Sequence, residues 1–332
     1  MALWTPADIS TELWLDPSDA STVTESGGVI TQLNDKSGND RHATQVATKP
    51  TPAIGSNTIN SLNVLTFTGT EILKTASQPI AGTSASMTFM VMRHTDTTEQ
   101  ALTCSGYTDV SAYAYFAAFS FSGRWVFDAL FNQRYMNLND AGASANVNYL
   151  MGYGYPANAS QTDAAGWETG SALAAWNGTA TTMNLAASTT TIGGRYSEGA
   201  DAVYNGLKGY IGEVIVCASF DSELRQLVEG YLADKWGLTG RLPTTHPFKT
   251  APPATGAISG TIIGADGQPA SRTVRLYRRD TGGLVDSTTS DSTTGEYSFV
   301  TSPSLGSVPL QCVALADESI TYNDLLHRVI PG

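Results

Sequence analysis

The sequence predicts an all-β protein with two β-sandwich domains, and three observations support this. Only 14% of the 332 residues are charged, against roughly 25% in an average globular protein. Gly, Thr, Ser, Ala and Asn fill the gap, a composition typical of short strands joined by tight turns. The length also exceeds that of a usual single domain, so we expect two domains.

The strands expected in the first domain are short apolar runs separated by Gly, Asn and Ser. Residues 62–67 alternate apolar and polar side chains, which predicts one buried face. Residues 87–92 are more continuously apolar, which predicts a central strand covered on both faces. Further strands are expected at 113–121, 124–127, 149–155, 166–172, 190–194 and 209–218, the first two forming a hairpin. This pattern is typical of a two-sheet sandwich or jelly roll.

One amphipathic helix is expected near the end of the first domain, over residues 222–236. Asp221 or Ser222 is the predicted N-cap, and Gly237 suits the left-handed position just past the end. The apolar stripe that should face the sandwich is Leu224, Leu227, Val228, Tyr231 and Leu232. The side chains expected to face away are Arg225, Gln226, Glu229 and Asp234. The helix should therefore pack with one face only.

A domain boundary is predicted near residue 250, where prolines occur without apolar periodicity. The first domain is residues 1–250, a Pro-rich linker is 251–256, and the second domain is 257–332. Strands are expected in the second domain at 258–263, 273–278, 284–288, 295–299, 309–315 and 325–330. The second domain is expected to hold about seven strands in all, which predicts a small immunoglobulin-like β-sandwich.

Charge, cysteine content and the N-terminal sequence narrow the classes of function. The net charge of −12 argues against nucleic acid as a partner, because phosphate binding needs clustered Lys and Arg. Cys104, Cys217 and Cys312 are odd in number and widely spaced, so we expect buried thiols. The N-terminus lacks a signal-peptide pattern, and no apolar run approaches a membrane span. We therefore expect assembly in a cytoplasm and no membrane insertion.

Five motifs of the first domain carry a resemblance to a known family. They are LWLD at 13–16, NDKSGNDRHAT at 34–44, LTFTGT at 65–70, GYIGEV at 209–214 and EGYLADKWG at 229–237. In this order they resemble concanavalin A-like (laminin-G-like) lectin/glucanase domains of phage virion proteins and bacterial surface proteins. The resemblance spans about residues 3–248 and implies a concanavalin A-like jelly-roll sandwich that displays a lectin-like surface.

The second domain resembles carboxypeptidase-regulatory-like (transthyretin-like) β-sandwiches. The motifs are SGT at 259–261, GQP at 267–269, VRLYR at 274–278 and TGEYSF at 294–299. The ending YNDLLHRVIPG at 322–332 is similar to the C-termini of phage structural proteins. That ending favours a virion component over a bacterial surface protein.

Asp35, Asn39 and Asp40 are the candidates for a metal site, because lectin-like sandwiches often hold calcium on loops at one rim. Calcium takes six to eight oxygen ligands, so several carboxylates would have to converge. A second acidic turn lies at 137–140. The alternative is that these residues form Asx turns with local backbone bonds. No cofactor other than calcium is expected.

Tyr135, Tyr196 and Tyr204 are the candidates for glycan binding, because an aromatic ring stacks on a sugar face beside polar groups. Each lies among polar neighbours in the sequence. Packing in the core or at an edge is the alternative for each of them. The other aromatic residues considered are Trp125, Tyr153, Tyr155, Trp167 and Trp176.

No catalytic set is recognisable. Retaining glycosidases need two carboxylates about 5–5.5 Å apart, which on a strand requires acids at period two. Asp16 and Asp19 have the wrong spacing, and Glu213 stands alone among apolar residues. The four histidines lie near no nucleophile elbow and are expected at the surface. We therefore expect no catalytic residues and no enzyme activity.

The sequence favours a non-enzymatic bacteriophage virion protein, with host receptor or glycan binding at the tail or tail fibre as the first hypothesis. A capsid decoration or head-fibre protein is one alternative, and a polysaccharide depolymerase is another. The expected partners are other virion proteins, a host surface glycan and further copies of the chain in a homo-oligomer. The expected location is the virion, after assembly in the host cytoplasm.

Overall fold

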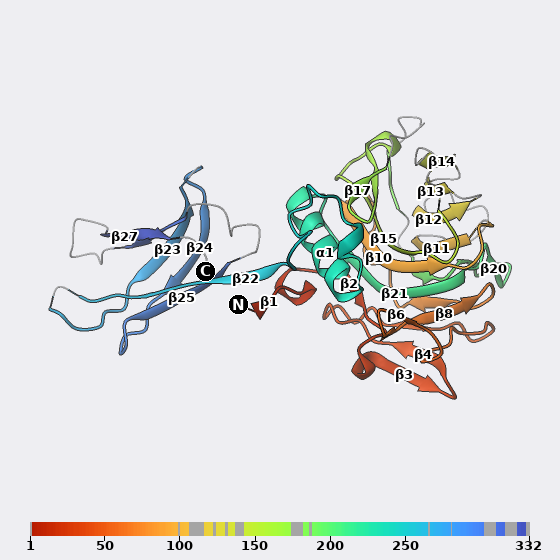
Figure 1. The fold of residues 1–332 in the computed structure, drawn as a ribbon, viewed down its shortest axis with the longest axis horizontal. Coiled ribbons are helices and arrows are strands. Elements are labelled where there is room, and N and C mark those ends of the chain that lie inside the picture. The colour runs from red at the N-terminus through yellow and green to blue at the C-terminus, as the bar shows by residue number, and fades with distance from the viewer. Residues whose placement is uncertain are drawn as a thin grey trace. The chain divides into compact units, whose positions relative to one another are not determined.

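The computed structural model divides the chain into two compact units (Figure 1). The larger unit is Thr5–Ala251, and the smaller unit combines Met1–Trp4 with Pro252–Gly332. The structure describes residues 2–98, 100–105, 116–121, 124–129, 132–136, 143–173, 182–185, 188–264, 266–279, 281–301, 310–315 and 324–329. Both units are built from antiparallel sheets, which confirms the predicted all-β class.

One sheet of the larger unit has seven strands. Its order is β17 (Ser171–Ala172), β16 (Ala165–Glu168), β15 (Asn148–Tyr155), β10 (Ser86–His94), β21 (Lys208–Cys217) and β2 (Leu13–Leu15), with β8 (Leu65–Thr68) also on β21. Strand β10 lies between β15 and β21, and all its residues except Arg93 are buried. The predicted central strand is therefore confirmed.

The second sheet has nine strands. Its order is β14 (Asn132–Met136), β13 (Arg124–Ala129), β12 (Phe116–Phe121), β11 (Gln100–Ser105), β18 (Thr190–Ile192), β9 (Leu73–Thr75), β5 (Ala43–Gln45), β4 (Val29–Leu33) and β3 (Val23–Ser26). Two short hairpins complete the strands of this unit, β6 (Thr58–Ile59) with β7 (Leu62–Asn63) and β19 (Arg195–Ser197) with β20 (Ala202–Tyr204). The predicted hairpin of β12 with β13 is confirmed, although residues 113–115 and its turn lie outside the described residues.

The main core lies between these two sheets. The alternation of side chains along β15 distinguishes the core-facing side of the seven-stranded sheet from its outer face. Tyr149, Met151, Tyr153 and Tyr155 belong to the core cluster together with residues of both sheets. Successive side chains of a strand point to opposite faces. The even-numbered positions of β15, including Gly152, therefore lie on the outer face of the seven-stranded sheet.

Helix α1 (Ser222–Lys235) packs against β10 and β15 on that outer face (Figure 1). Asp221 is the N-cap, since its side chain accepts hydrogen bonds from the backbone N–H groups of Glu223 and Leu224. Gly237 has φ +70° and so takes the left-handed position that the sequence predicted. The helix and both of its ends are therefore confirmed.

The expectation that α1 buries only one face is wrong. Glu229, expected to face away, is buried and accepts hydrogen bonds from Arg225 and His246. Phe248 closes over the helix at Gly230, where a Cβ would lie 2.7 Å from the Phe248 Cβ. The chain after the helix thus folds back and covers its second face, a contact between distant residues that helix periodicity does not report.

The strand expected over 166–172 is two strands, β16 and β17, joined by a two-residue turn. Thr169 has φ +48° and Gly170 has φ +79°. Positive φ at both central residues is the geometry of a type I′ hairpin turn. The sequence did not predict this turn, because Asn-Gly and Asp-Gly are the usual sequences of type I′ turns and Thr-Gly is not.

The smaller unit has a three-stranded and a four-stranded sheet. The first is β1 (Ala2–Leu3), β22 (Ala254–Thr261) and β25 (Glu296–Thr301); the second is β24 (Leu284–Thr289), β23 (Thr273–Arg278), β26 (Leu310–Ala314) and β27 (Asp324–Val329). Ile258, Leu276 and Phe299 are among the side chains of their shared core. Strand β1 was not predicted: Ala2 and Leu3 pair with Thr255 and Ala254, so the N-terminus supplies the seventh described strand.

Candidate functional site

A groove of about 280 Å³ opens on the outer face of the seven-stranded sheet, beside the start of α1. Its lining residues are Met87, Trp167, Phe220, Asp221, Ser222 and Arg225. Trp167 and Phe220 are both partly exposed, and their ring centroids are 6.1 Å apart. The groove therefore combines accessible aromatic surface with hydroxyl, carboxylate and guanidinium groups.

Strand register and one glycine place Trp167 in this groove. Gly152 of β15 pairs with Phe89 of β10 on one side and with Trp167 of β16 on the other. A Cβ at Gly152 would lie 3.2 Å from the Phe89 ring and 3.5 Å from the Trp167 ring. A larger residue would crowd Phe89 and fill the space between the two rings. The glycine therefore leaves room for the groove on this part of the outer face.

The polar side of the groove comes from α1. Arg225 lies with its guanidinium carbon 4.9 Å from the centroid of the Trp167 ring. Its Nη1 donates to both carboxylate oxygens of Glu229, at 2.8 and 2.6 Å. Asp221 caps the helix through Oδ1, at 3.0 and 2.8 Å from two backbone nitrogens. These contacts hold the polar groups in place before any ligand arrives.

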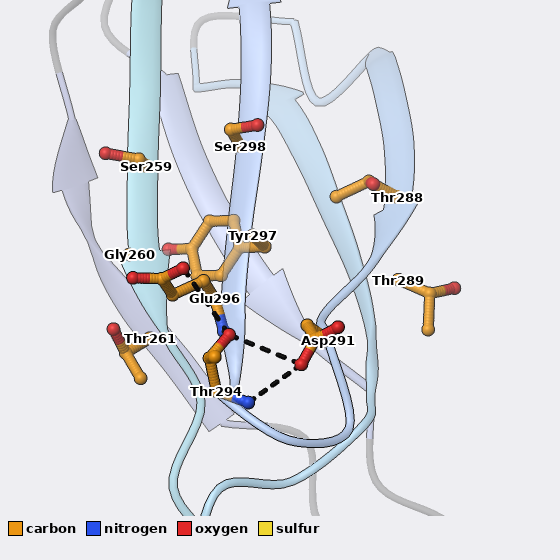
Figure 2. Close-up of a pocket in the computed structure, with 10 residues that line it drawn as sticks. All are labelled: Ser259, Gly260, Thr261, Thr288, Thr289, Asp291, Thr294, Glu296, Tyr297 and Ser298. Carbon is orange, nitrogen blue, oxygen red and sulfur yellow. Dashed lines mark hydrogen bonds between the residues drawn. The ribbon is translucent and has the colours of Figure 1, made fainter.

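A second groove, of about 790 Å³, lies in the smaller unit between β22, β25 and the end of β24 (Figure 2). Six Ser and Thr residues, Asp291 and Glu296 contribute most of its lining. The Asp291 carboxylate is engaged within its own turn, where Oδ1 accepts from the backbone nitrogens of Thr293 and Thr294. Tyr297, the one aromatic residue in the lining, packs against the core of the unit. This groove offers little surface for stacking a ring.

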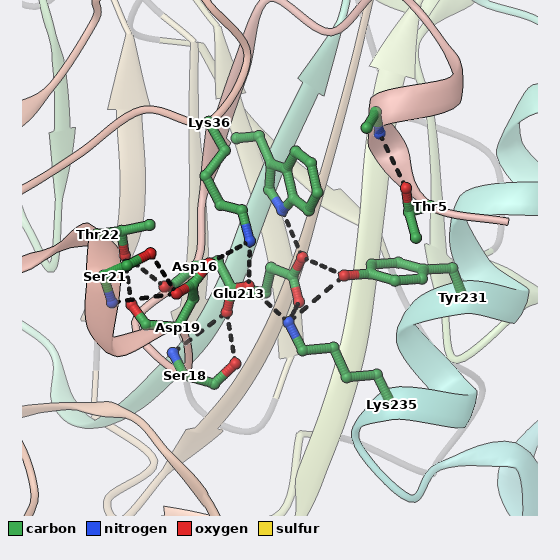
Figure 3. Close-up of polar contacts among 12 residues, drawn as sticks. Thr5, Asp16, Ser18, Asp19, Ser21, Thr22, Lys36, Glu213, Tyr231 and Lys235 are labelled. Carbon is green, nitrogen blue, oxygen red and sulfur yellow. Dashed lines mark hydrogen bonds and ion pairs between the residues drawn. The ribbon is translucent and has the colours of Figure 1, made fainter. Parts of the chain in front are cut away.

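A cluster of charged and polar side chains surrounds buried Glu213 (Figure 3). Glu213 Oε1 accepts from Trp14 Nε1 at 2.6 Å and from Tyr231 Oη at 3.0 Å. Its Oε2 accepts from Lys235 Nζ at 2.7 Å and from Trp236 Nε1 at 3.0 Å. The expectation that Glu213 stands alone among apolar residues is wrong, because four donors from β2, α1 and the C-cap residue of α1 surround it.

Asp16 extends this cluster on the other side of the Lys235 ammonium, at 2.8 Å. Lys36 Nζ lies 3.1 Å from Asp16 and 2.8 Å from Asp19. The same ammonium lies 4.4 Å from the centroid of the Trp14 ring. Two lysines thus bridge three carboxylates, which come from residues 16–19 and from β21.

Burial and neighbouring charges set the protonation of this cluster. Burial raises the pKa of Glu213 and the nearby Asp16 carboxylate raises it further, while Lys235 opposes both. Burial also opposes the ionisation of Asp16, but attraction to Lys235 and hydrogen bonds from Lys235 and Ser18 outweigh it and lower the pKa of Asp16. With side-chain exposures of 0% and 3%, the two acids have no access to a substrate. Their shared contact with Lys235 joins distant segments of the chain, and neither carboxylate is exposed as a glycosidase pair requires.

The calcium candidates Asp35, Asn39 and Asp40 differ in their surroundings. Asp35 accepts four hydrogen bonds, from the backbone nitrogens of Trp14, Ser37 and Arg41 and from the Ser37 hydroxyl. Asn39 Nδ2 donates to the carbonyl of Thr11. The Asp40 side chain is 91% exposed. Within the described ranges, no group of three or more His, Cys, Asp and Glu side chains is placed to hold a metal ion.

The glycan candidates Tyr196 and Tyr204 lie on opposite faces of the β19–β20 hairpin. Tyr196 pairs with Val203, and Tyr204 pairs with Arg195. Tyr196 is only 7% exposed, packs with buried Val46 and Ile72, and donates to Asp201 at 2.8 Å. Tyr204 is 36% exposed. The side chain of Tyr135, on β14, and the turn at 137–140 lie outside what the structure describes.

Two histidines expected at the surface are buried, so that expectation is wrong for them. His94 lies in the core beside Trp125 and Tyr149, at centroid distances of 5.7 and 5.9 Å. His246 Nε2 bonds Glu229 at 3.1 Å, and its Nδ1 accepts from the Phe248 backbone at 3.2 Å. Their polar sequence neighbours concealed this packing. The three cysteines are buried thiols, as predicted.

Comparisons with known proteins locate similar folds. No protein-family model and no curated protein matches the sequence. Among solved structures, a Trypanosoma rangeli sialidase in complex with sialic acid is 13% identical, with a TM-score of 0.44, over 67% of this chain and 33% of that one. This chain therefore spans about a third of the sialidase.

Two further structures are similar at a comparable level. Domain 4 of AbnA, a GH43 extracellular arabinanase from Geobacillus stearothermophilus in complex with arabinotriose, is 10% identical, with a TM-score of 0.44, over 62% of this chain and 91% of that one. The binding domain of botulinum neurotoxin serotype D is 8% identical, with a TM-score of 0.46, over 95% of this chain and 72% of that one. None of these three similarities assigns a function to this chain.

No helix in the part of the chain that the structure describes is long and apolar enough to cross a membrane.

Replacing Lys235 with Met should destabilise the larger unit by about 3 kcal/mol or more, because two buried carboxylates lose their shared cation. Urea unfolding followed by tryptophan fluorescence measures the change. The matched control is Lys74→Met, whose pair with Glu198 at 2.8 Å is partly exposed and should contribute less than about 1 kcal/mol. Equal, small losses in both variants would contradict this role of Lys235.

Acid should weaken the contact between Asp19 and Lys36. The hydrogen bond from Lys36, helped by Ser21, lowers the pKa of Asp19 from 3.8 to about 2. A lowered pKa adds stability that is complete above pH 3.8 and is lost as the pH falls through about 2. Urea midpoints measured between pH 5 and pH 2 should therefore fall less steeply in Asp19→Asn than in the wild type. Parallel profiles would argue against this contact.

Replacing Tyr196 with Ala should cost about 3 kcal/mol, because a buried aromatic ring is removed from its packing. Tyr204→Ala, at a partly exposed ring, should change the free energy of unfolding by less than about 1 kcal/mol. Urea unfolding of both variants distinguishes a packing role from a surface role. Equal stability of Tyr196→Ala and the wild type would contradict the packing of Tyr196.

Proposed function

We propose that the larger unit binds glycans without cleaving them, and that the groove at Trp167 is the binding site. The observation that carries this proposal is an accessible Trp ring beside fixed polar groups in one groove. An aromatic face stacks on the C–H face of a sugar, while neighbouring polar groups bond its hydroxyls. Asp221 and Ser222 supply such groups at the rim.

The absence of cleavage is part of the proposal. Asp16 and Glu213, which share Lys235, are both buried. The groove itself offers one carboxylate, Asp221, among its lining residues, whereas retaining and inverting glycosidases both need a pair. Incubating the protein with capsular polysaccharide and measuring new reducing ends tests this, and sustained release would show a depolymerase instead.

We further propose that the chain is displayed on a bacteriophage particle, with the tail or a tail fibre as the first choice and the capsid exterior as the alternative. The support is the resemblance of the first-domain motifs to domains of phage virion proteins and bacterial surface proteins, together with the similarity of residues 322–332 to phage structural proteins. Antibody labelling of intact particles tests the placement. Label at the tail tip favours receptor binding, regular label over the head favours decoration, and no label on particles contradicts both.

Replacing Trp167 with Ala should weaken glycan binding about tenfold or more, because loss of one stacked ring removes roughly 1.4 kcal/mol. Glycan-array screening identifies the ligand, and isothermal titration measures both proteins. Tyr204→Ala, on the β19–β20 hairpin, is the comparison variant and should bind like the wild type. Loss in Tyr204→Ala with full binding by Trp167→Ala would move the site to that hairpin.

A further inference from the structure

We infer that the groove at Trp167 selects neutral sugars over anionic sugars, an inference that rests on the proposed glycan binding. The decisive feature is that Arg225, the one cation in its lining, has its charge engaged within the protein. Nη1 bonds both oxygens of Glu229, and the guanidinium stacks on Trp167. A sugar carboxylate would therefore have to compete with an ion pair that is already formed.

That competition is unfavourable because Glu229 is buried. The Glu229 side chain is 1% exposed, and the Arg225 side chain is 14% exposed. Besides Arg225, His246 Nε2 bonds Glu229, at 3.1 Å. Drawing Arg225 towards a ligand would leave a buried carboxylate with its histidine as the remaining side-chain partner, and an unpaired buried charge is strongly destabilising. Nη1 of Arg225 is thus committed to Glu229 and the guanidinium lies over the Trp167 ring, which makes this arginine a poor receptor for a sugar carboxylate.

The charges around the groove point the same way. Asp221 is exposed at the rim, and Glu223 follows it in the first turn of α1. The positive end of a helix attracts anions. At the N-terminus of α1, however, the Asp221 carboxylate already accepts hydrogen bonds from the first free N–H groups. An anionic sugar would meet the Asp221 carboxylate first, whereas a sugar hydroxyl would donate a hydrogen bond to it.

The size of the groove adds a limit on length. Sites for drug-sized ligands usually enclose about 300–1,000 Å³, and this groove measures about 280 Å³. The groove is therefore small for a ligand that engages several sugar rings at once. The ligand class that fits is a single neutral ring, held at a chain end or within a neutral polysaccharide.

Isothermal titration with a neutral panel (maltotriose, mannotriose, arabinotriose) and an anionic panel (3′-sialyllactose, trigalacturonate) tests the inference at two salt concentrations. At least one neutral sugar should bind the wild type ten times more tightly than either anionic sugar, and Trp167→Ala should lose that binding. Asp221→Asn should reduce the difference in affinity between neutral and anionic sugars, because anionic sugars bind more tightly to it. Added salt should also reduce this difference, because it screens the repulsion from Asp221.

The outcomes separate this inference from the proposed function. Anionic sugars that bind as tightly as neutral ones, with loss in Trp167→Ala, would overturn the selectivity and leave glycan binding at this groove standing. No binding to either panel, or binding unchanged in Trp167→Ala, would overturn both. Thermal unfolding of each variant shows whether a loss of binding comes from a loss of fold.

Discussion

The ammonium of Lys235, held between Asp16 and Glu213 at 2.8 and 2.7 Å, is the contact on which the arrangement of the larger unit depends. It joins three segments that are far apart in the sequence: the opening motif, strand β21 and helix α1. A buried ion pair is weak support for stability, because desolvation offsets most of the attraction. Its value here is specificity: an uncompensated carboxylate on β21 would be costly in any other register or helix placement.

This contact also determines where the candidate groove forms. It fixes the C-terminal turn of α1, and the Trp236 ring rests on β21 at Gly212, where a Cβ would lie 2.9 Å from it. The helix has 14 residues and therefore spans about 20 Å. With one end fixed over β21 and one face packed on β10 and β15, its other end must lie near β16. Asp221 and Arg225 thus reach Trp167 because of charges at the far end of the same helix.

The sequence predicted what local periodicity determines and missed what distant residues determine. The helix and strand β10 were predictable, because amphipathic spacing and continuous apolar character are local signals. The sequence did not indicate the partners of Glu213, because its hydrogen-bond donors lie some 200 positions before it and about 20 after it. For Tyr196, polar neighbours left both glycan binding and packing open, and contacts with Asp201 and a small apolar cluster, which the sequence does not report, bury it. The groove was not predictable, because strand pairing and the packing of α1 bring Trp167 to its partners.

The groove's dimensions bear on how such a protein would work. One sugar ring has about a dozen non-hydrogen atoms, and at about −0.3 kcal/mol for each atom its binding free energy is about −4 kcal/mol, a Kd near 1 mM. A single copy would hold a surface glycan only briefly. Several copies on one particle would bind about 10² to 10⁴ times more tightly, because each further contact is intramolecular. Under the proposed function, a small and weak site is better suited to multivalent display than to capture by one molecule.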